Sequence, residues 1–158
     1  MLTFLTEMSL KYLRIPYAMR RVPLEKIATL LPIAKTPNAG DIALVRLEKI
    51  GKNARLELPN GRPCNLHEGD LLAVVFGNRY ATNQYEGYAR RNGDQIDLMS
   101  MGGLCGLVEY KYDTVTGPSK LRLLGMIGDA DGNALNTRQF ALAPIACRQR
   151  PRVIVVCG

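Results

Sequence analysis

DIALVRLEKIG, residues 41–51, is the stretch of the sequence that decides the fold class. The side chains from Ile42 to Leu47 repeat with a period of two, and Gly51 closes the run. A period of two places neighbouring side chains on opposite faces of an extended chain. The stretch therefore predicts a β-strand, and it marks the start of a β-rich body.

Two further β signals follow it. Asn60-Gly61 stands between extended runs at 55–58 and 62–66, and Asn-Gly is a strong hairpin signal because both residues tolerate a positive φ. Residues 71–76 form a continuous apolar run, which is typical of a strand buried on both faces. We expect a hairpin with its tip at Asn60-Gly61 and then a central strand.

The rest of the body alternates short strands with turns. Asn92-Gly93-Asp94 predicts a hairpin turn between 87–91 and 95–99, and further strands are expected at 107–112, 120–127 and 139–142. This spacing predicts a mainly β fold, namely a small, closed or partly open, antiparallel β-barrel with one short N-terminal helix. A sandwich is the second choice, because both architectures deal with exposed strand edges.

The short helix is expected at Pro23–Leu31. Pro23 would occupy the first helical position, Glu25 lies in the first turn, and Pro32 stops the pattern. The segment before it fits either a strand or a helix. Residues 35–40 have turn chemistry and lead into the body.

The distribution of charge suggests how the chain divides. The formal net charge is +7, yet residues 1–40 hold six basic and two acidic side chains and residues 144–158 hold three basic ones, which leaves twelve of each sign in 41–143. A neutral body lacks the basic stripe that phosphate-backbone binding favours. We predict an N-terminal extension with a short helix (1–40), a β-barrel domain (41–143), and a basic linker with the first strand of a missing P-loop domain (144–158).

Composition predicts a soluble, cytoplasmic protein without a metal site. No apolar run approaches the ~20 residues needed to span a bilayer, and the N-terminal charge order is wrong for a secretory signal. His67 is the only histidine, and the cysteines are too far apart for a C-x-x-C pair. Reduced thiols are therefore expected at Cys64, Cys105, Cys147 and Cys157.

The C-terminal segment has the pattern of a strand that leads into a phosphate-binding loop. Residues 148–152 form a basic, Pro-containing link, and 153–158 form a β-branched run that ends in glycine. The alternative is a last barrel strand. The Gly-Lys-Ser/Thr of a P-loop is absent from this chain, so ATP and Mg²⁺ are expected only in a missing C-terminal domain.

A resemblance to a known family rests on several short motifs. They are Gly40-Asp41, Leu56–Gly61, Gly69-Asp70, Gly77–Ala81, Gln84–Glu86, Asp129–Gly132 and Leu135-Asn136. Over residues 40–158 the chain resembles the N-terminal β domain of uncharacterised bacterial P-loop ATP-binding proteins. The resemblance implies a following P-loop domain, and it carries over no activity.

The best candidate for a binding site is the segment from Gly77 to Tyr88, expected to be a long loop. It combines aromatic faces, a cation and side-chain amides. The candidate residues are Asn78, Arg79, Tyr80, Asn83, Gln84 and Tyr85, facing Gly102 and Gly103. In the alternative interpretation, the tyrosines only close one end of the barrel.

Other motifs give weaker signals. Residues 100–106 are glycine-rich but lack the lysine of a P-loop, which favours a tight corner of the barrel. Residues 129–133 mimic the start of a calcium loop, but the required glycine and glutamate are missing, which favours a simple turn. Ser100 or Cys105 could pair with His67 for nucleophilic catalysis, yet no motif frames either one, so no catalytic residue is predicted.

The sequence thus leads to one functional hypothesis and two alternatives. The hypothesis is a non-catalytic domain that recognises a substrate or partner, or regulates, for a P-loop protein of unknown activity. The first alternative is a barrel that binds RNA or single-stranded nucleic acid through the flanking arginines and Tyr80, Tyr85 and Tyr88. The second is a small stand-alone enzyme with its site at the glycine-rich corner. The expected partners are an unidentified ligand or protein and the P-loop domain, and no membrane.

Overall fold

A computed structural model describes residues 3–5, 11–33, 36–145, 152 and 154–156 of the chain. The protein is mainly β, with 41% of residues in strands and 9% in helical turns, and no helix in the described part reaches seven residues. This confirms the predicted fold class. No helix among these residues is long and apolar enough to cross a membrane.

The described part contains eleven strands and three short 3₁₀ helices. The strands are β1 (Thr3–Phe4), β2 (Thr29–Leu31), β3 (Ile42–Lys49), β4 (Arg55–Glu57), β5 (Pro63–Asn65), β6 (Leu71–Phe76), β7 (Arg79–Tyr80), β8 (Tyr85–Tyr88), β9 (Gln95–Leu98), β10 (Leu104–Lys111) and β11 (Ser119–Gly128). The 3₁₀ helices are η1 (Tyr17–Met19), η2 (Leu24–Lys26) and η3 (Thr137–Phe140).

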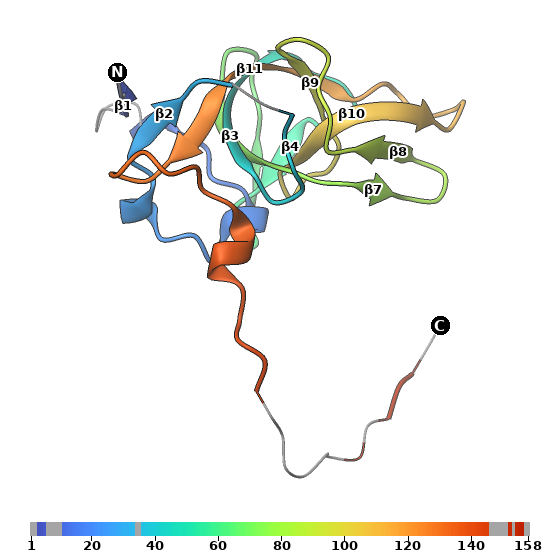
Figure 1. Cartoon of the computed structure of the whole chain (residues 1–158). Coiled ribbons are helices and arrows are strands. Elements are labelled where there is room, and N and C mark those ends of the chain that lie inside the picture. The colour runs from blue at the N-terminus through green and yellow to red at the C-terminus, as the bar shows by residue number, and fades with distance from the viewer. Residues whose placement is uncertain (1–2, 6–10, 34–35, 146–151, 153, 157–158) are drawn as a thin grey trace.

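Five strands form a closed ring of hydrogen bonds (Figure 1). Strand β3 pairs antiparallel with β6 and β11, and β9 pairs antiparallel with β10 and β11. The ring is completed by β6 and β10, whose pairing is parallel. A ring leaves fewer unpaired strand edges than an open sheet.

The core lies on both faces of β3 and β6. Ala43, Val45 and Leu47 pack inside the ring, in the same cluster as Leu72 and Phe76. The alternate residues of both strands pack on the other side against the N-terminal segment, in a cluster that includes Ile42, Ala73, Met19, Val22 and Ile27. This second layer explains why 71–76 is an unbroken apolar run, and it makes the N-terminal extension part of the core.

The N-terminal helix is much shorter than predicted. Its described form is η2, three residues long, with Pro23 as the N-cap. Thr29–Leu31, expected to continue the helix, is instead strand β2, which pairs with β11. A tertiary partner overrides the helical spacing here, because the Thr29 hydroxyl donates to Asp129 O (2.8 Å) and Gly128 leaves room for the Thr29 side chain.

The hairpin at Asn60-Gly61 is confirmed, with β4 and β5 as its strands. Only Gly61 takes a positive φ, at 79°, so the tip is a turn followed by one left-handed residue. Gly61 N donates to Leu58 O (2.8 Å), which closes this turn.

One strand pairing and one strand expected from the sequence are wrong. A tight turn does occur at Asn92–Gln95, but β8 and β9 are not hairpin partners, because β10 lies between them. Residues 139–142 are not a strand: η3 occupies Thr137–Phe140, where the Asn136 and Gln139 side chains form a capping box. This box satisfies backbone groups locally, so the segment needs no strand partner.

The turn predicted at 129–133 is present. The Asp129 carboxylate accepts hydrogen bonds from the backbone N–H groups of Asp131 (3.0 Å) and Asn133 (2.8 Å). Farther along the chain, the run expected as a P-loop strand is described only at residues 154–156. These residues lie outside any strand and are exposed, whereas Val153 and Cys157 lie outside the described residues.

Candidate functional site

The segment predicted as a long binding loop is a β-hairpin. Strands β7 and β8 pair antiparallel, with Arg79 opposite Gly87 and Tyr80 opposite Glu86. The turn between them places Asn83 at φ 57°, the only positive φ of a non-glycine residue in the described chain. An asparagine tolerates this left-handed conformation better than most residues.

The end of β10 and the residue that follows it bring two further tyrosines to this hairpin. The end of the strand pairs with β8, so that Tyr110 lies opposite Glu86, and Tyr112 N donates to Gln84 O (2.9 Å). A cavity of about 200 Å³ lies between the two segments and is lined by residues 80–86 and 110–112. We call this cavity the tyrosine groove.

Three tyrosines of the groove face solvent. Tyr80, Tyr110 and Tyr112 are 78%, 67% and 53% exposed. No hydrogen bond from any of their hydroxyls to a described residue is present in the structure. Their aromatic faces and hydroxyls are therefore available to another molecule.

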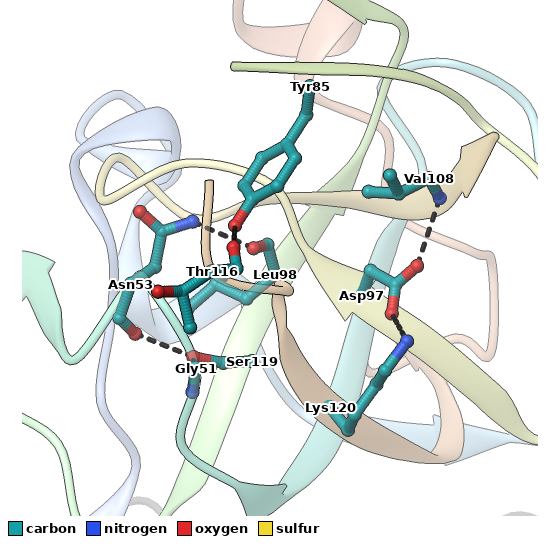
Figure 2. A network of polar contacts seen from close by, with 9 residues as sticks. All are labelled: Gly51, Asn53, Tyr85, Asp97, Leu98, Val108, Thr116, Ser119 and Lys120. Carbon is teal, nitrogen blue, oxygen red and sulfur yellow. Dashed lines mark hydrogen bonds and ion pairs between the residues drawn. The ribbon is translucent and has the colours of Figure 1, made fainter. Parts of the chain in front are cut away.

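Tyr85 is buried, and Figure 2 shows its hydroxyl directed at Thr116. Its side chain is 1% exposed, and its hydroxyl donates a hydrogen bond to Thr116 O. The Lys52 ammonium lies 5.6 Å from the centre of the ring. Burial raises the pKa of Tyr85 above the ordinary value, although the nearby Arg79 charge opposes this shift. Tyr85 therefore forms a wall of the groove and holds the hairpin to the ring.

Two other predicted site residues are used within the protein itself. The Arg79 guanidinium donates to Met99 O and to Gln84 Oε1 (3.0 Å). The Asn78 side chain accepts from Ala89 N (2.9 Å). Of the six hairpin candidates, Tyr80 and Asn83 are thus the ones that are exposed and without such a bond.

The two predicted glycines lie elsewhere. Gly102 O accepts from Ala18 N (3.0 Å), and Gly103 O accepts from Val75 N (2.9 Å). A Cβ atom on Gly103 would lie 2.2 Å from Pro16 Cβ, so this turn packs tightly against the N-terminal segment. Neither glycine lines the tyrosine groove.

A network of polar contacts joins strands of the ring through three buried side chains, Asn53, Asp97 and Ser119 (Figure 2). The Ser119 hydroxyl donates to Asn53 O (2.8 Å) and accepts from Gly51 N (2.9 Å), while the Asn53 side chain donates to Leu98 O (2.9 Å). The Asp97 carboxylate accepts from Val108 N (2.9 Å) and from the Lys120 ammonium (2.7 Å). These bonds tie β9, β10 and β11 together.

The sequence did not point to the buried residues of this network, nor to Tyr110 on β10 and Tyr112 just after it. Asn53, Asp97 and Ser119 are isolated polar residues whose partners lie far away in the sequence, so no local pattern marks them. Tyr110 and Tyr112 were part of an expected strand at 107–112. Their pairing with the hairpin could have been found only from the register between β8 and β10.

The residues considered for catalysis do not form a site. Cys105 is fully buried, and burial holds the pKa of its thiol well above the ordinary value, whereas a nucleophilic cysteine needs a lowered one. The Ser100 hydroxyl accepts from Leu104 N (3.3 Å). His67 is exposed, and its Nδ1 lies 3.9 Å from Asp70 Oδ2. Within the described ranges, no group of three or more His, Cys, Asp or Glu residues could hold a metal ion.

The comparisons with known proteins add no relative. A scan against protein-family models, a search of curated proteins and a search of solved structures each found no match.

Proposed function

We propose that this protein is a binding module that recognises a segment of a protein partner through the tyrosine groove. The observation that carries this proposal is the convergence of Tyr80, Tyr110 and Tyr112 from two segments about 30 residues apart in the sequence. The fold buries none of the three. Exposed tyrosines gathered around a hollow are typical of recognition surfaces, because a rigid aromatic ring gives a large contact area at a low cost in entropy.

The charge of the groove favours a protein partner over nucleic acid. Its lining contains one cation, Lys111, and one carboxylate, Glu86, and the neighbouring Arg79 is held by Met99 and Gln84. Binding a phosphate backbone uses several free cations, with affinity that falls steeply with salt. A groove of aromatic and amide groups with balanced charge suits a peptide better.

The position of β7 supports the proposal that the partner segment binds in an extended conformation. Strand β7 ends the order of strands in the sheet and pairs only with β8 among the described residues. An extended chain could add to such an edge through backbone hydrogen bonds while its side chains contact the tyrosines.

A wider role rests on the resemblance to P-loop ATP-binding proteins. In that role the module presents a partner or substrate to a P-loop domain in the cytoplasm, or regulates that domain. ATP and Mg²⁺ then belong to the P-loop domain, and the module supplies recognition rather than chemistry.

Site-specific photocrosslinking in cells that express the protein tests the proposal. A photoreactive phenylalanine analogue replaces Tyr80 in one variant and Tyr110 in another, and Tyr12 in the control, because Tyr12 is 64% exposed and does not line the groove. We expect the same discrete protein adduct from Tyr80 and Tyr110, lost when Tyr112→Ala is added, and no such adduct from Tyr12. Equal labelling at all three positions would contradict the proposal.

Fluorescence anisotropy with a single-stranded RNA of about 20 nucleotides separates the nucleic-acid alternative. We expect no binding at moderate salt that depends on the groove. Binding that weakens steeply with salt and is lost in Tyr80→Ala and Tyr110→Ala would instead make the groove an RNA site.

A further inference from the structure

A second cavity, of about 280 Å³, lies between the N-terminal segment that follows η1 and the short helix η3. Figure 1 shows these elements at the end of the molecule from which the C-terminal segment leaves. Arg20, Arg21 and Arg138 line the cavity together with Val22, Thr137 and Phe140. We call it the arginine cavity. It is separate from the tyrosine groove, and no lining residue is shared.

The cavity gathers positive charge without a counter-charge. No acidic residue lines it, and the ion pairs among the described residues involve none of the three arginines. Like charges around one hollow repel each other, and this cost is relieved when an anion lies between them. The side chains of Arg21 and Arg138 make no hydrogen bond or ion pair with a described residue.

One of the arginines is already oriented by its neighbours. The Arg20 guanidinium lies 4.3 Å from the centre of the Tyr17 ring and donates to Tyr17 O at 3.4 Å. Both contacts fix the plane of the guanidinium, and neither neutralises it. Its remaining N–H groups are left for a ligand.

Both walls of the cavity are held in place. Thr137 N donates to Gly40 O (2.9 Å), and the capping box of Asn136 and Gln139 closes the start of η3. On the other wall, Val22 N donates to Met19 O (2.8 Å), and Met19 is fully buried. A site that needs little ordering on binding retains more of its interaction energy as affinity.

The lining defines the chemistry of the ligand. Guanidinium groups bind phosphate oxygens in pairs of parallel hydrogen bonds, and the Thr137 hydroxyl adds a neutral donor. Buried Val22 and half-buried Phe140 give the cavity an apolar side. We infer that the arginine cavity binds a small phosphate-bearing molecule, whose phosphate contacts the arginines while its carbon portion contacts Val22 and Phe140. This site is independent of the function proposed for the tyrosine groove.

Isothermal titration calorimetry with inorganic pyrophosphate, at constant ionic strength, tests this inference. The test variant is the double substitution Arg21→Ala and Arg138→Ala. The matched control is Arg55→Ala with Arg62→Ala, which removes the same charge from exposed positions on the β4–β5 hairpin. We expect saturable binding at one site, weakened about tenfold or more in the test variant and unchanged in the control.

Two further measurements complete the test. Amide chemical shifts of Arg20 and Thr137 should move on titration, and thermal melting should show that both double variants are folded. An equal loss of affinity in the two variants would overturn the inference, because it would show attraction by net charge alone. Absence of saturable binding up to about 10 mM pyrophosphate would also overturn it.

Discussion

Tyr80 and Tyr85 belong to the same hairpin, yet one is 78% exposed and the other 1%. The hydroxyl of Tyr85 donates to Thr116 O, and the Lys52 ammonium lies 5.6 Å from the centre of its ring. Both parts of this side chain therefore interact with other parts of the fold. The fold makes no comparable use of Tyr80. Residue type alone therefore does not separate packing from recognition. Tyr80 lies opposite Glu86 in the hairpin, and Tyr85 precedes Glu86 on β8, so the side chain of Tyr85 points to the other face.

The same contrast separates the ring from the two cavities. Among the described residues, every buried side-chain nitrogen and oxygen atom has a hydrogen-bond partner. In contrast, the hydroxyls of the exposed tyrosines in the groove and the guanidinium groups of Arg21 and Arg138 make no hydrogen bond or ion pair with a described residue. We interpret the first region as the part that holds the fold and the second as the part that meets other molecules. Four predictions test this division, in order of decreasing effect on stability.

Truncating the ring core should have the largest effect. Phe76 is fully buried inside the ring, so Phe76→Ala should lower the free energy of unfolding by about 3–5 kcal/mol. Tyr80→Ala should change it by about 0.5 kcal/mol or less. Urea unfolding of both variants measures the two values. Similar losses would show that the hairpin belongs to the core.

Removing a buried hydroxyl should cost less than removing a core ring. Ser119→Ala leaves Gly51 N and Asn53 O without this partner in a buried place, which should cost about 1–3 kcal/mol of unfolding free energy. Thr114→Ala, at an exposed position, is the control for loss of a hydroxyl. Equal urea midpoints for the two variants would argue against a bracing role for the network.

The Tyr85 hydroxyl should contribute about 1 kcal/mol to the free energy of unfolding through its hydrogen bond to Thr116 O. Tyr85→Phe should therefore be mildly destabilising, and Tyr80→Phe should leave the stability unchanged. The folded-state pKa of Tyr85 is raised above its ordinary value of 10.0, chiefly by burial. The contribution of the protonated Tyr85 side chain to the free energy of unfolding is therefore fully present below pH 10. It is lost as the pH rises through the folded-state pKa. Between pH 8 and 11 the melting temperature should fall more for the wild type than for Tyr85→Phe.

The smallest effect is expected at Asp129. Hydrogen bonds from Asn133 lower its pKa below the ordinary value of 3.8, so its contribution is present above that value and is lost as the pH falls through the lowered pKa. Asp129→Asn should lower the melting temperature at neutral pH, and the difference from the wild type should shrink in acid. Asp131→Asn is the control, since only the backbone N–H of Asp131 takes part in the turn. A difference that does not shrink as the pH is lowered from neutral into the acid range would contradict this interpretation.

The sequence predicted which segment carries the candidate site, but it did not predict the structure of that segment. The segment from Gly77 to Tyr88 does carry the groove, because its mixture of aromatic and amide side chains is visible in the sequence. Its hairpin structure was not predicted, since Arg79 and Tyr80 are a two-residue strand without a detectable period. The convergence of the arginines at the second cavity was not predicted: Arg20 and Arg21 were counted with the N-terminal flank and Arg138 with the neutral body, because Arg138 is more than a hundred residues from Arg20 in the sequence.

Features that depend on neighbouring residues could be predicted from the sequence. The period of two in Ile42–Leu47, the apolar run of β6 and the left-handed Gly61 at the hairpin tip follow from local geometry and local burial. Three other features come from contacts between distant segments: Thr29–Leu31 is a strand, β6 pairs in parallel with β10, and Tyr110 and Tyr112 contact the hairpin. These features depend on which strands pair and in which register, and both are set by packing across the ring because no local pattern specifies them.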